Sequence, residues 1–221
     1  MITLVLEAAT YAGSAALLED GVLRGERSVA MRGREHEALM PAVAVLLAEH
    51  DVAPLAIGRV VCGAGPGSFT SLRIAGAIAK GLAFAAGCPL VPVSSLALMV
   101  ASIPSLAPGR YLACLDAMRS EFYVGLFELA KDGDVKALTP EERMPSGDVA
   151  DRARGWDARL IGPAHPEGSE IAPHARGAAR LIALIEATPA ADLAAWEPAY
   201  GRLAEAQVKW EATHGRSLEV G

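Results

Sequence analysis

The chain has 221 residues, of which 52% are apolar and 21% charged, so we expect a folded protein with one substantial core or two small ones. Its formal net charge of −6 and its aromatic content of 5% argue against direct binding of nucleic acid. Cys62, Cys88 and Cys114 form no C-x-x-C pair and favour the reducing cytoplasm. No export signal stands at the N-terminus and no apolar run reaches about 18 residues, so no membrane association is expected.

The first half of the sequence alternates strand and helix patterns. Asp20-Gly21 marks a hairpin turn between two β-type runs. After the hairpin, two segments with apolar residues at helical spacing alternate with two short apolar runs that are typical of buried strands. The expected strands cover residues 2–8, 13–21, 22–30, 57–63 and 89–96, the last running into a helix, and the other expected helices cover residues 34–50 and 70–87.

The second half repeats the beginning of the first. Leu115-Asp116-Ala117 corresponds to Leu6-Glu7-Ala8, and each is followed by a second strand pattern and a turn, which indicates an internal duplication. We therefore predict two lobes, residues 1–104 and 105–221. The expected elements of the second lobe are strands at 110–118, 121–130, 135–144 and 159–163 and a helix at 175–190, with residues 213–221 as a loose tail.

Two halves of this kind are similar to the actin-like, Hsp70-like ATPase fold (ASKHA, ribonuclease H-like), an α/β class. This chain is short for that fold, because members that bind ATP carry inserted helices around the adenosine. The resemblance therefore implies a minimal and degenerate version.

A glycine-rich loop precedes the helix at 70–87. It contains no lysine for a P-loop and no third glycine for a dinucleotide site. Free N–H groups at the helix start would suit an anion, whereas Gly65, Pro66 and Gly67 would simply turn the chain, with Ser68 or Thr70 capping the helix. We adopt the second interpretation.

Five stretches together resemble the TsaB (YeaZ) family. They are "REH" at 34–36, "GPGSFTSLR" at 65–73, "VSSL" at 93–96, "LDAMRSEFY" at 115–123 and "EPAYGR" at 197–202. The chain departs from the family at three places. It has Glu7-Ala8-Ala9 where the family usually has D-T-S or D-T-A, and Ser71-Leu72-Arg73 where the family usually has G-L-R. It also has Met118 where arginine is common.

Metal binding is not expected. The catalytic paralogue of the family binds metal through histidines spaced i, i+4 on the helix that here holds His36, but the i+4 residue is Met40. His50 lies about 21 Å of helix rise away from His36. An independent ATP-dependent enzyme of the same fold, and more weakly a metallopeptidase-like protein, are the alternative functions.

The helix at 70–87 carries small residues every four positions, which permit close approach of another helix, although such a stripe also suits packing on its own sheet. The helix at 34–50 is apolar over a wide arc and needs burial on two sides. The resemblance implies that both helices form a subunit interface. The residues predicted to bind a partner are His36, Met40, Val43, Leu47, Ser71, Arg73, Ala75, Ala79 and Ala83.

The resemblance also implies a function. The chain would be a non-catalytic subunit that pairs with TsaD and supports threonylcarbamoyl transfer to the adenosine beside the tRNA anticodon. ATP and metal would be bound by TsaD, the isolated protein would hold no cofactor, and tRNA would be reached only through the complex. A TsaE-like ATPase is a further expected partner, and a homodimer is expected when the chain is alone.

Overall fold

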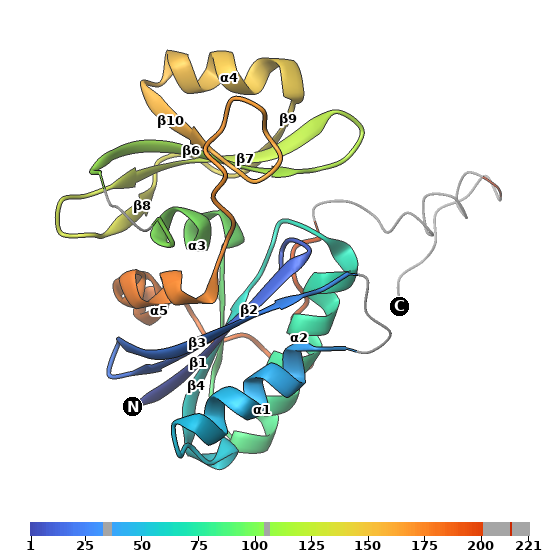
Figure 1. Ribbon diagram of the computed structural model, residues 1–221, viewed down its shortest axis with the longest axis vertical. Coiled ribbons are helices and arrows are strands. Elements are labelled where there is room, and N and C mark those ends of the chain that lie inside the picture. Colours follow the sequence, from blue (N-terminus) through green and yellow to red (C-terminus); the bar gives the residue numbers. More distant parts are fainter. Residues whose placement is uncertain (33–36, 104–106, 201–212, 214–221) are drawn as a thin grey trace.

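Two mixed β-sheets organise the chain, one in each lobe of the computed structural model, which describes residues 1–32, 37–103, 107–200 and 213 (Figure 1). The first sheet has the strand order β3-β2-β1-β4-β5, in which β2 and β3 form an antiparallel meander with β1 while β4 and β5 run parallel to β1. Its strands are β1 (Ile2–Glu7), β2 (Ala12–Glu19), β3 (Val22–Ala30), β4 (Ile57–Gly63) and β5 (Leu90–Val93).

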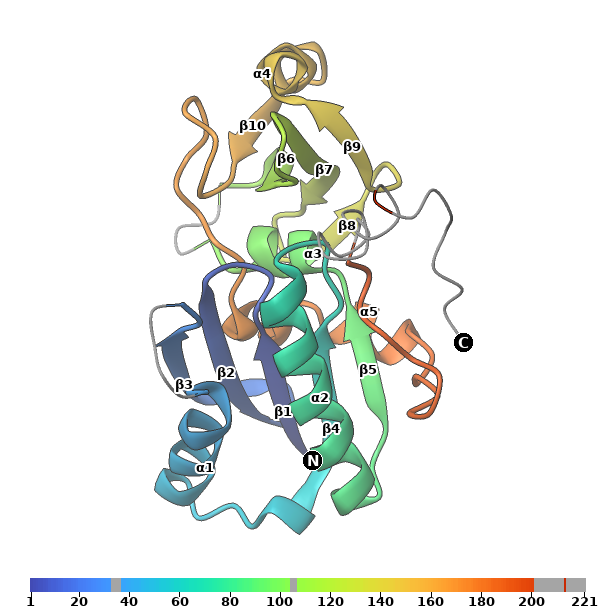
Figure 2. The same cartoon turned by 90° about the vertical axis from the view of Figure 1, so that its right-hand side faces the viewer.

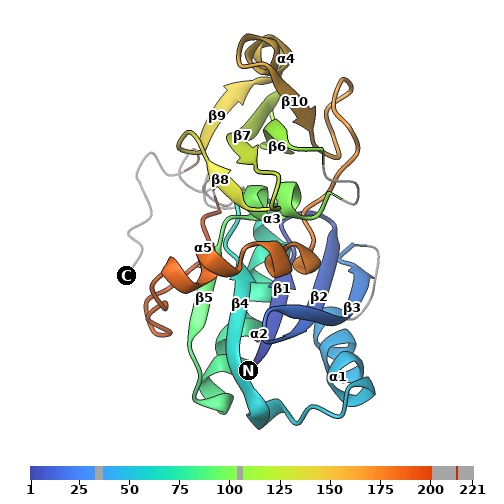
Figure 3. The ribbon, with the colours of Figure 1, turned by 90° about the vertical axis from the view of Figure 1, so that its left-hand side faces the viewer.

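Both faces of this sheet are covered, which explains why β1 reads as a continuous apolar run rather than an alternating one. Leu4 and Leu6 belong to the core beneath α1 (Leu39–Glu49) and α2 (Phe69–Ala86). Val5 belongs to the core beneath the 3₁₀ helix η2 (Ala175–Arg180) and α5 (Ile182–Ala187). Figures 2 and 3 show the two faces, with α1 and α2 in front in the first and α5 in front in the second.

Helix α3 (Ser95–Ala101) lies between the lobes (Figure 1). All seven of its residues are buried. Those from Leu96 onward belong to a cluster that also contains Val5 of the first sheet and Tyr111 and Phe127 of the second. The two lobes therefore share one hydrophobic core around α3.

The second sheet has the order β10-β6-β7-β8, with β9 also paired to β7. It repeats the first sheet, because β7 is antiparallel to β6, β10 is parallel to β6, and a helix precedes β10 as α1 precedes β4. The predicted duplicated actin-like α/β fold is confirmed by this topology. The elements are β6 (Gly109–Asp116), β7 (Glu121–Leu129), β8 (Val135–Ala137), β9 (Glu142–Pro145), α4 (Ser146–Gly155) and β10 (Ala158–Ile161).

The single strand predicted over residues 135–144 is wrong. The structure has two short strands there, β8 opposite Phe127–Leu129 and β9 opposite Glu121–Val124. Pro140 stands between them, and because proline has no N–H to donate, it interrupts the pairing.

The chain after residue 174 returns to the first lobe, where the sequence had suggested elements of the second. Ala178, Leu181 and Ile185 pack with Val5 and Leu18 of the first sheet. Further along, the N–H of residue 191 donates to the Leu90 carbonyl at 2.8 Å. The predicted helix at 175–190 is in fact η2 followed by the short α5.

Other boundaries differ less. The predicted helix at 34–50 begins at Leu39 within the described residues, and its first part, with His36, lies outside them. A short 3₁₀ helix, η1 (Pro54–Ala56), precedes β4. Helix α2 is long and apolar enough, by length and composition alone, to cross a membrane. In this fold it packs on the first sheet through Ala75, Ala79 and Ala83, as a core helix does.

Candidate functional site

The glycine-rich loop between β4 and α2 is closed by hydrogen bonds within the protein. The N–H of Ser68 donates to the Ala9 carbonyl at 2.7 Å, and the Ser95 N–H donates to the Gly65 carbonyl at 2.9 Å. The Gly65 N–H donates to the Ser95 hydroxyl oxygen at 3.2 Å. Because Pro66 carries no N–H and the N–H groups of Gly65 and Ser68 are bonded within the chain, these contacts support the interpretation of residues 65–68 as a turn.

Glycine is required at Gly67 by close approach. A Cβ there would lie 2.3 Å from the Ala9 carbonyl oxygen, and its φ of +159° lies at the limit of the left-handed range. Ser68 is the N-cap residue of α2, but its side chain makes no cap hydrogen bond and contacts the Ser71 hydroxyl at 3.1 Å instead. The predicted side-chain cap by Ser68 or Thr70 is therefore wrong. Backbone hydrogen bonds of the loop fix the start of α2 instead.

Glu7 ends β1 directly beneath this loop, and its carboxyl group is fully buried. Ser95 donates its hydroxyl proton to Glu7 Oε2 at 2.8 Å, and the Ala9 N–H donates to Oε1 at 2.5 Å. Burial raises the pKa of Glu7 to about 7, and these hydrogen bonds hold it from rising further. A Cβ at Gly63 would stand 1.8 Å from Oε2. The carboxyl group of Glu7 is thus enclosed within the protein and bonded to its own chain.

The predicted partner-facing stripe of α2 faces the protein's own sheet. Ala75, Ala79 and Ala83 are 0% exposed within the single chain, in the core with Leu4 and Leu6. Ser71 is buried as well. The prediction that these side chains contact a partner helix is wrong, because their small size is what allows α2 to lie close against the first sheet.

The opposite side of α2 is exposed and, apart from Arg73, made of small and apolar residues. Arg73, Ala77 and Gly81 follow one another at helical spacing along it. Phe84, one turn further, is 80% exposed. Because Phe84 continues a run of exposed small residues rather than standing alone, this side of α2 is a candidate contact surface. Sequence reasoning missed Phe84, although an aromatic residue beside the buried Ala83 was the available signal.

Helix α1 presents a second apolar face beside it on the same side of the first sheet (Figure 2). Met40 is 38% exposed and Val45 49% exposed, with Pro41 and Ala44 exposed between them. Of the residues predicted for this interface, Met40 and Arg73 are exposed. Val43 and Leu47 are buried in the core of the chain, so their assignment to a partner contact is wrong. We call the exposed residues Met40, Pro41, Ala44, Val45, Arg73, Ala77, Gly81 and Phe84 the α1–α2 face.

The C-terminal part of the described chain borders this face. Pro198 and Trp196 pack beside Gly76, and Lys80 Nζ donates to the Trp196 carbonyl at 3.0 Å. Tyr200 stacks against Phe69 with ring centroids 4.6 Å apart. These contacts pack the beginning of the "EPAYGR" stretch onto α2, and residues 201 and 202 of that stretch lie outside the described residues.

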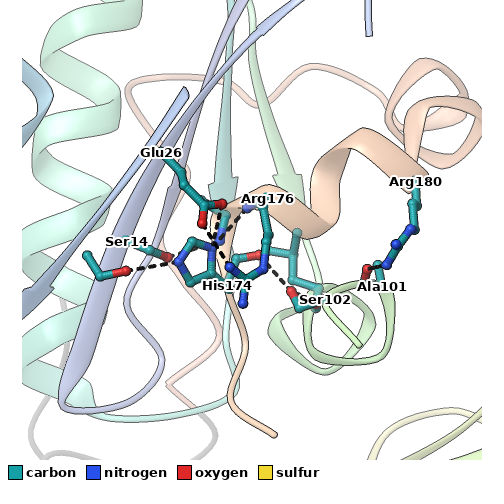
Figure 4. A network of polar contacts seen from close by, with 10 residues as sticks. Ser14, Glu26, Ala101, Ser102, His174, Arg176 and Arg180 are labelled. Atoms are coloured by element: carbon teal, nitrogen blue, oxygen red, sulfur yellow. Dashed lines mark hydrogen bonds and ion pairs between the residues drawn. The ribbon is translucent and has the colours of Figure 1, made fainter. Parts of the chain in front are cut away.

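A polar network joins the chain returning from the second lobe to the first sheet (Figure 4). His174 Nε2 lies 3.0 Å from the hydroxyl oxygen of Ser28, and His174 Nδ1 accepts a hydrogen bond from the Arg176 N–H. Arg176 also pairs with Glu26 at 2.8 Å. Burial and the neighbouring Arg176 lower the pKa of His174, against the pull of Glu26. These residues are far apart in sequence, so no local pattern could have predicted the network.

Ser14 is the buried anchor of this network, and its Oγ accepts the Ala175 N–H at 2.9 Å. Replacing Ser14 by alanine is expected to lower the free energy of unfolding by about 1–3 kcal/mol, because a buried N–H loses its acceptor. Ser28→Ala, at an exposed position of the same network, should change it by about 0.5 kcal/mol or less. Urea unfolding measures both, and equal effects of the two variants would contradict the anchoring role of Ser14.

The metal prediction concerns residues in part outside the described chain. Within residues 1–32, 37–103, 107–200 and 213, no group of three or more histidine, cysteine, aspartate or glutamate side chains is placed to hold a metal ion. His50 contacts Gly25 at the far end of α1. Met40 stands one turn beyond His36 in the sequence.

The repeated topology of the two sheets defines a protein of the actin-like ATPase fold. A family model described as "TsaD: tRNA N6-adenosine threonylcarbamoyltransferase" matches residues 31–183. The chain is 33% identical to the tRNA threonylcarbamoyladenosine biosynthesis protein TsaB of Escherichia coli, over 72% of this chain and 73% of that protein. It therefore belongs to the TsaB family of tRNA threonylcarbamoyladenosine biosynthesis proteins, as the sequence motifs predicted.

Two further similarities extend over nearly the whole chain. TsaB of Bacillus subtilis is 28% identical over 95% of this chain and 98% of its own length. The structure of YeaZ from Pseudomonas aeruginosa superposes with a TM-score of 0.76 at 28% identity, covering 90% of this chain and 99% of that one. The full two-lobed architecture is thus shared with YeaZ from Pseudomonas aeruginosa.

Proposed function

We propose that the chain is the accessory subunit of a threonylcarbamoyl transfer complex and that it docks on a TsaD-like transferase through the α1–α2 face. The observation that carries this proposal is the run of exposed apolar residues on two neighbouring helices, with Phe84 80% exposed. Helices that are apolar beyond their buried side favour burial against a partner.

The proposal assigns different roles to this chain and to its TsaD-like partner. ATP and metal belong to the TsaD-like partner, and this chain holds neither by itself. Glu7 lies buried at the end of β1, bonded to Ser95, where a nucleotide-binding relative of the fold would offer a carboxylate to a metal-bound phosphate. The subunit reaches tRNA only through the complex, in the cytoplasm. A TsaE-like ATPase joins the same assembly.

We further propose that the isolated chain forms a homodimer through the same α1–α2 face. A face that two copies present to each other is self-complementary in a two-fold dimer. The homodimer and the complex with the transferase would therefore use overlapping residues, so a chain bound to a second copy could not bind the transferase at the same time.

Ala77→Arg tests this directly. The side chain of Ala77 points to solvent in the single chain, so the variant should fold normally but place a charged chain in the contact. We expect its association with the TsaD-like partner from the same organism to weaken at least tenfold, or by about 1.4 kcal/mol or more. Sedimentation velocity of the mixed proteins measures the change, and Phe84→Ser should act in the same direction.

Leu184→Ser is the matched control, because Leu184 is also an exposed apolar residue, 40% exposed, but lies on α5 on the opposite side of the first sheet (Figure 3). It should leave association unchanged. If Leu184→Ser weakened association and Ala77→Arg did not, the contact would lie on the other face and the proposal would be wrong.

A further inference from the structure

The second lobe contains a cavity of about 430 Å³ at the carboxyl end of β6, away from the α1–α2 face. Three segments form it: the turn that carries Asp116 and Ser120, the first turn of α4 with Ser146 and Gly147, and the turn after β10 with His165 and Glu167. The carboxyl ends of parallel strands such as β6 and β10 are where α/β folds place ligands.

His165 is the buried polar side chain of this cavity. It is 7% exposed, and its ring packs against Phe122 with centroids 5.1 Å apart. Its Nδ1 accepts the Glu167 N–H at 3.2 Å, which leaves the proton of the neutral ring on Nε2. Within the described part of the chain, Nε2 has no hydrogen-bond partner. Because Nε2 is not completely enclosed by the described residues, this N–H can donate to an acceptor that enters the cavity.

The start of α4 adds further donors to the same cavity. The Ser146 N–H donates to the Ser120 carbonyl at 2.9 Å, and no side chain caps the helix. The next two N–H groups along the chain belong to Gly147, which lines the cavity, and to Asp148. They are among the first N–H groups of the helix, which have no acceptor within the helix itself. Helix N-termini of this kind bind carboxylates and phosphates.

Asp116 adds a negative charge to the cavity, opposite in sign to the partial positive charge at the start of α4. One of its oxygens accepts the Met118 N–H at 2.7 Å, and it forms no ion pair with any described residue. Glu167, the other carboxylate of the cavity, is already paired with Arg154 at 3.3 Å. Asp116 would repel a simple anion at the helix start, but it would attract a ligand that also carries a positive group.

We propose that this cavity binds a small zwitterion of the α-amino-acid type. Its carboxylate accepts hydrogen bonds from His165 Nε2 and from the N–H groups of Gly147 and Asp148, while its ammonium group pairs with Asp116. The volume leaves room for a side chain on the ligand. This inference is independent of the docking proposed for the α1–α2 face, because it concerns the other lobe.

The test is a titration of the ¹⁵N-labelled full chain, followed by the amide signals of Gly147 and Asp148. Alanine carries both charges, whereas acetate and methylammonium carry one each. We expect alanine to bind with a dissociation constant of about 1 mM or tighter and each single-charge probe to bind at least tenfold more weakly. Acetate binding as tightly as alanine, or no saturable shift with alanine, would overturn the proposal.

Two variants assign the roles. His165→Phe keeps a ring against Phe122 and removes the Nε2 donor, and Asp116→Asn keeps the acceptor for the Met118 N–H and removes the charge. Each should weaken alanine binding at least tenfold, while Asp134→Asn, at an exposed aspartate outside the cavity, should not. If His165→Phe fails to fold, Asp116→Asn still decides, because unchanged alanine binding by that variant contradicts the proposal.

Discussion

Replacing Ala79 by arginine is expected to prevent the chain from forming a stable first lobe. Ala79 is 0% exposed and packs with the core residues of the first sheet, Leu4 and Leu6 among them. Overpacking alone costs about 1–3 kcal/mol, and an unpaired buried charge adds several more. The sum approaches the whole stability of a typical domain, which is about 5–15 kcal/mol. Thermal melting and the yield of soluble protein measure the loss.

Ala77→Arg serves as the matched control for this effect. It introduces the same side chain two residues away on the same helix, at a position exposed to solvent. The two variants therefore separate the two sides of α2, since Ala79→Arg should damage folding and Ala77→Arg only association. An Ala79→Arg variant that melts with the wild type and loses only its partner would show that the buried side of α2 has been assigned wrongly.

The second large effect is a pH dependence of stability that originates at Glu7. Its pKa is about 7 in the folded chain, against an ordinary value of 4.5. The folded state therefore keeps a proton that the unfolded state releases between these values. The contribution of Glu7 to stability is complete below about pH 4.5 and is lost as the pH rises to about 7. At about 1.4 kcal/mol per pKa unit, the loss is on the order of 3 kcal/mol.

Glu7→Gln should remove this dependence. Glutamine keeps the acceptor for the Ala9 N–H and can donate to the Ser95 hydroxyl oxygen, but it carries no charge. We expect the variant to become more stable relative to wild type as the pH rises through this range, with a constant difference above it. Urea unfolding at several pH values measures the difference, and Glu186→Gln, at an exposed glutamate of α5, is the control. Parallel pH profiles of Glu7→Gln and wild type would contradict the assignment of the titration to Glu7.

The sequence predicted the family more completely than it predicted the candidate contact surface. The motif around residues 65–73 carries enough unusual residues, with two glycines and a proline, to indicate both the family and the start of α2. The assignment of a partner contact to these two helices stays a prediction. Of the residues chosen on them, Met40 and Arg73 are exposed and available for such a contact, whereas Val43, Leu47 and the alanine stripe are buried in the core of the chain.

Local patterns by themselves determined the strands of the first sheet, the hairpin at Asp20-Gly21 and the duplication, because strand alternation, turn residues and the repeated Leu-acidic-Ala element depend only on neighbours in the chain. Only the tertiary structure decided which side of α2 is buried. Small residues line both Ala75–Ala79–Ala83 and Ala77–Gly81, so helical spacing alone cannot choose between them. It also decided where residues 175–200 pack, and it brought His165 to the start of α4, since each of these depends on contacts between segments far apart in sequence.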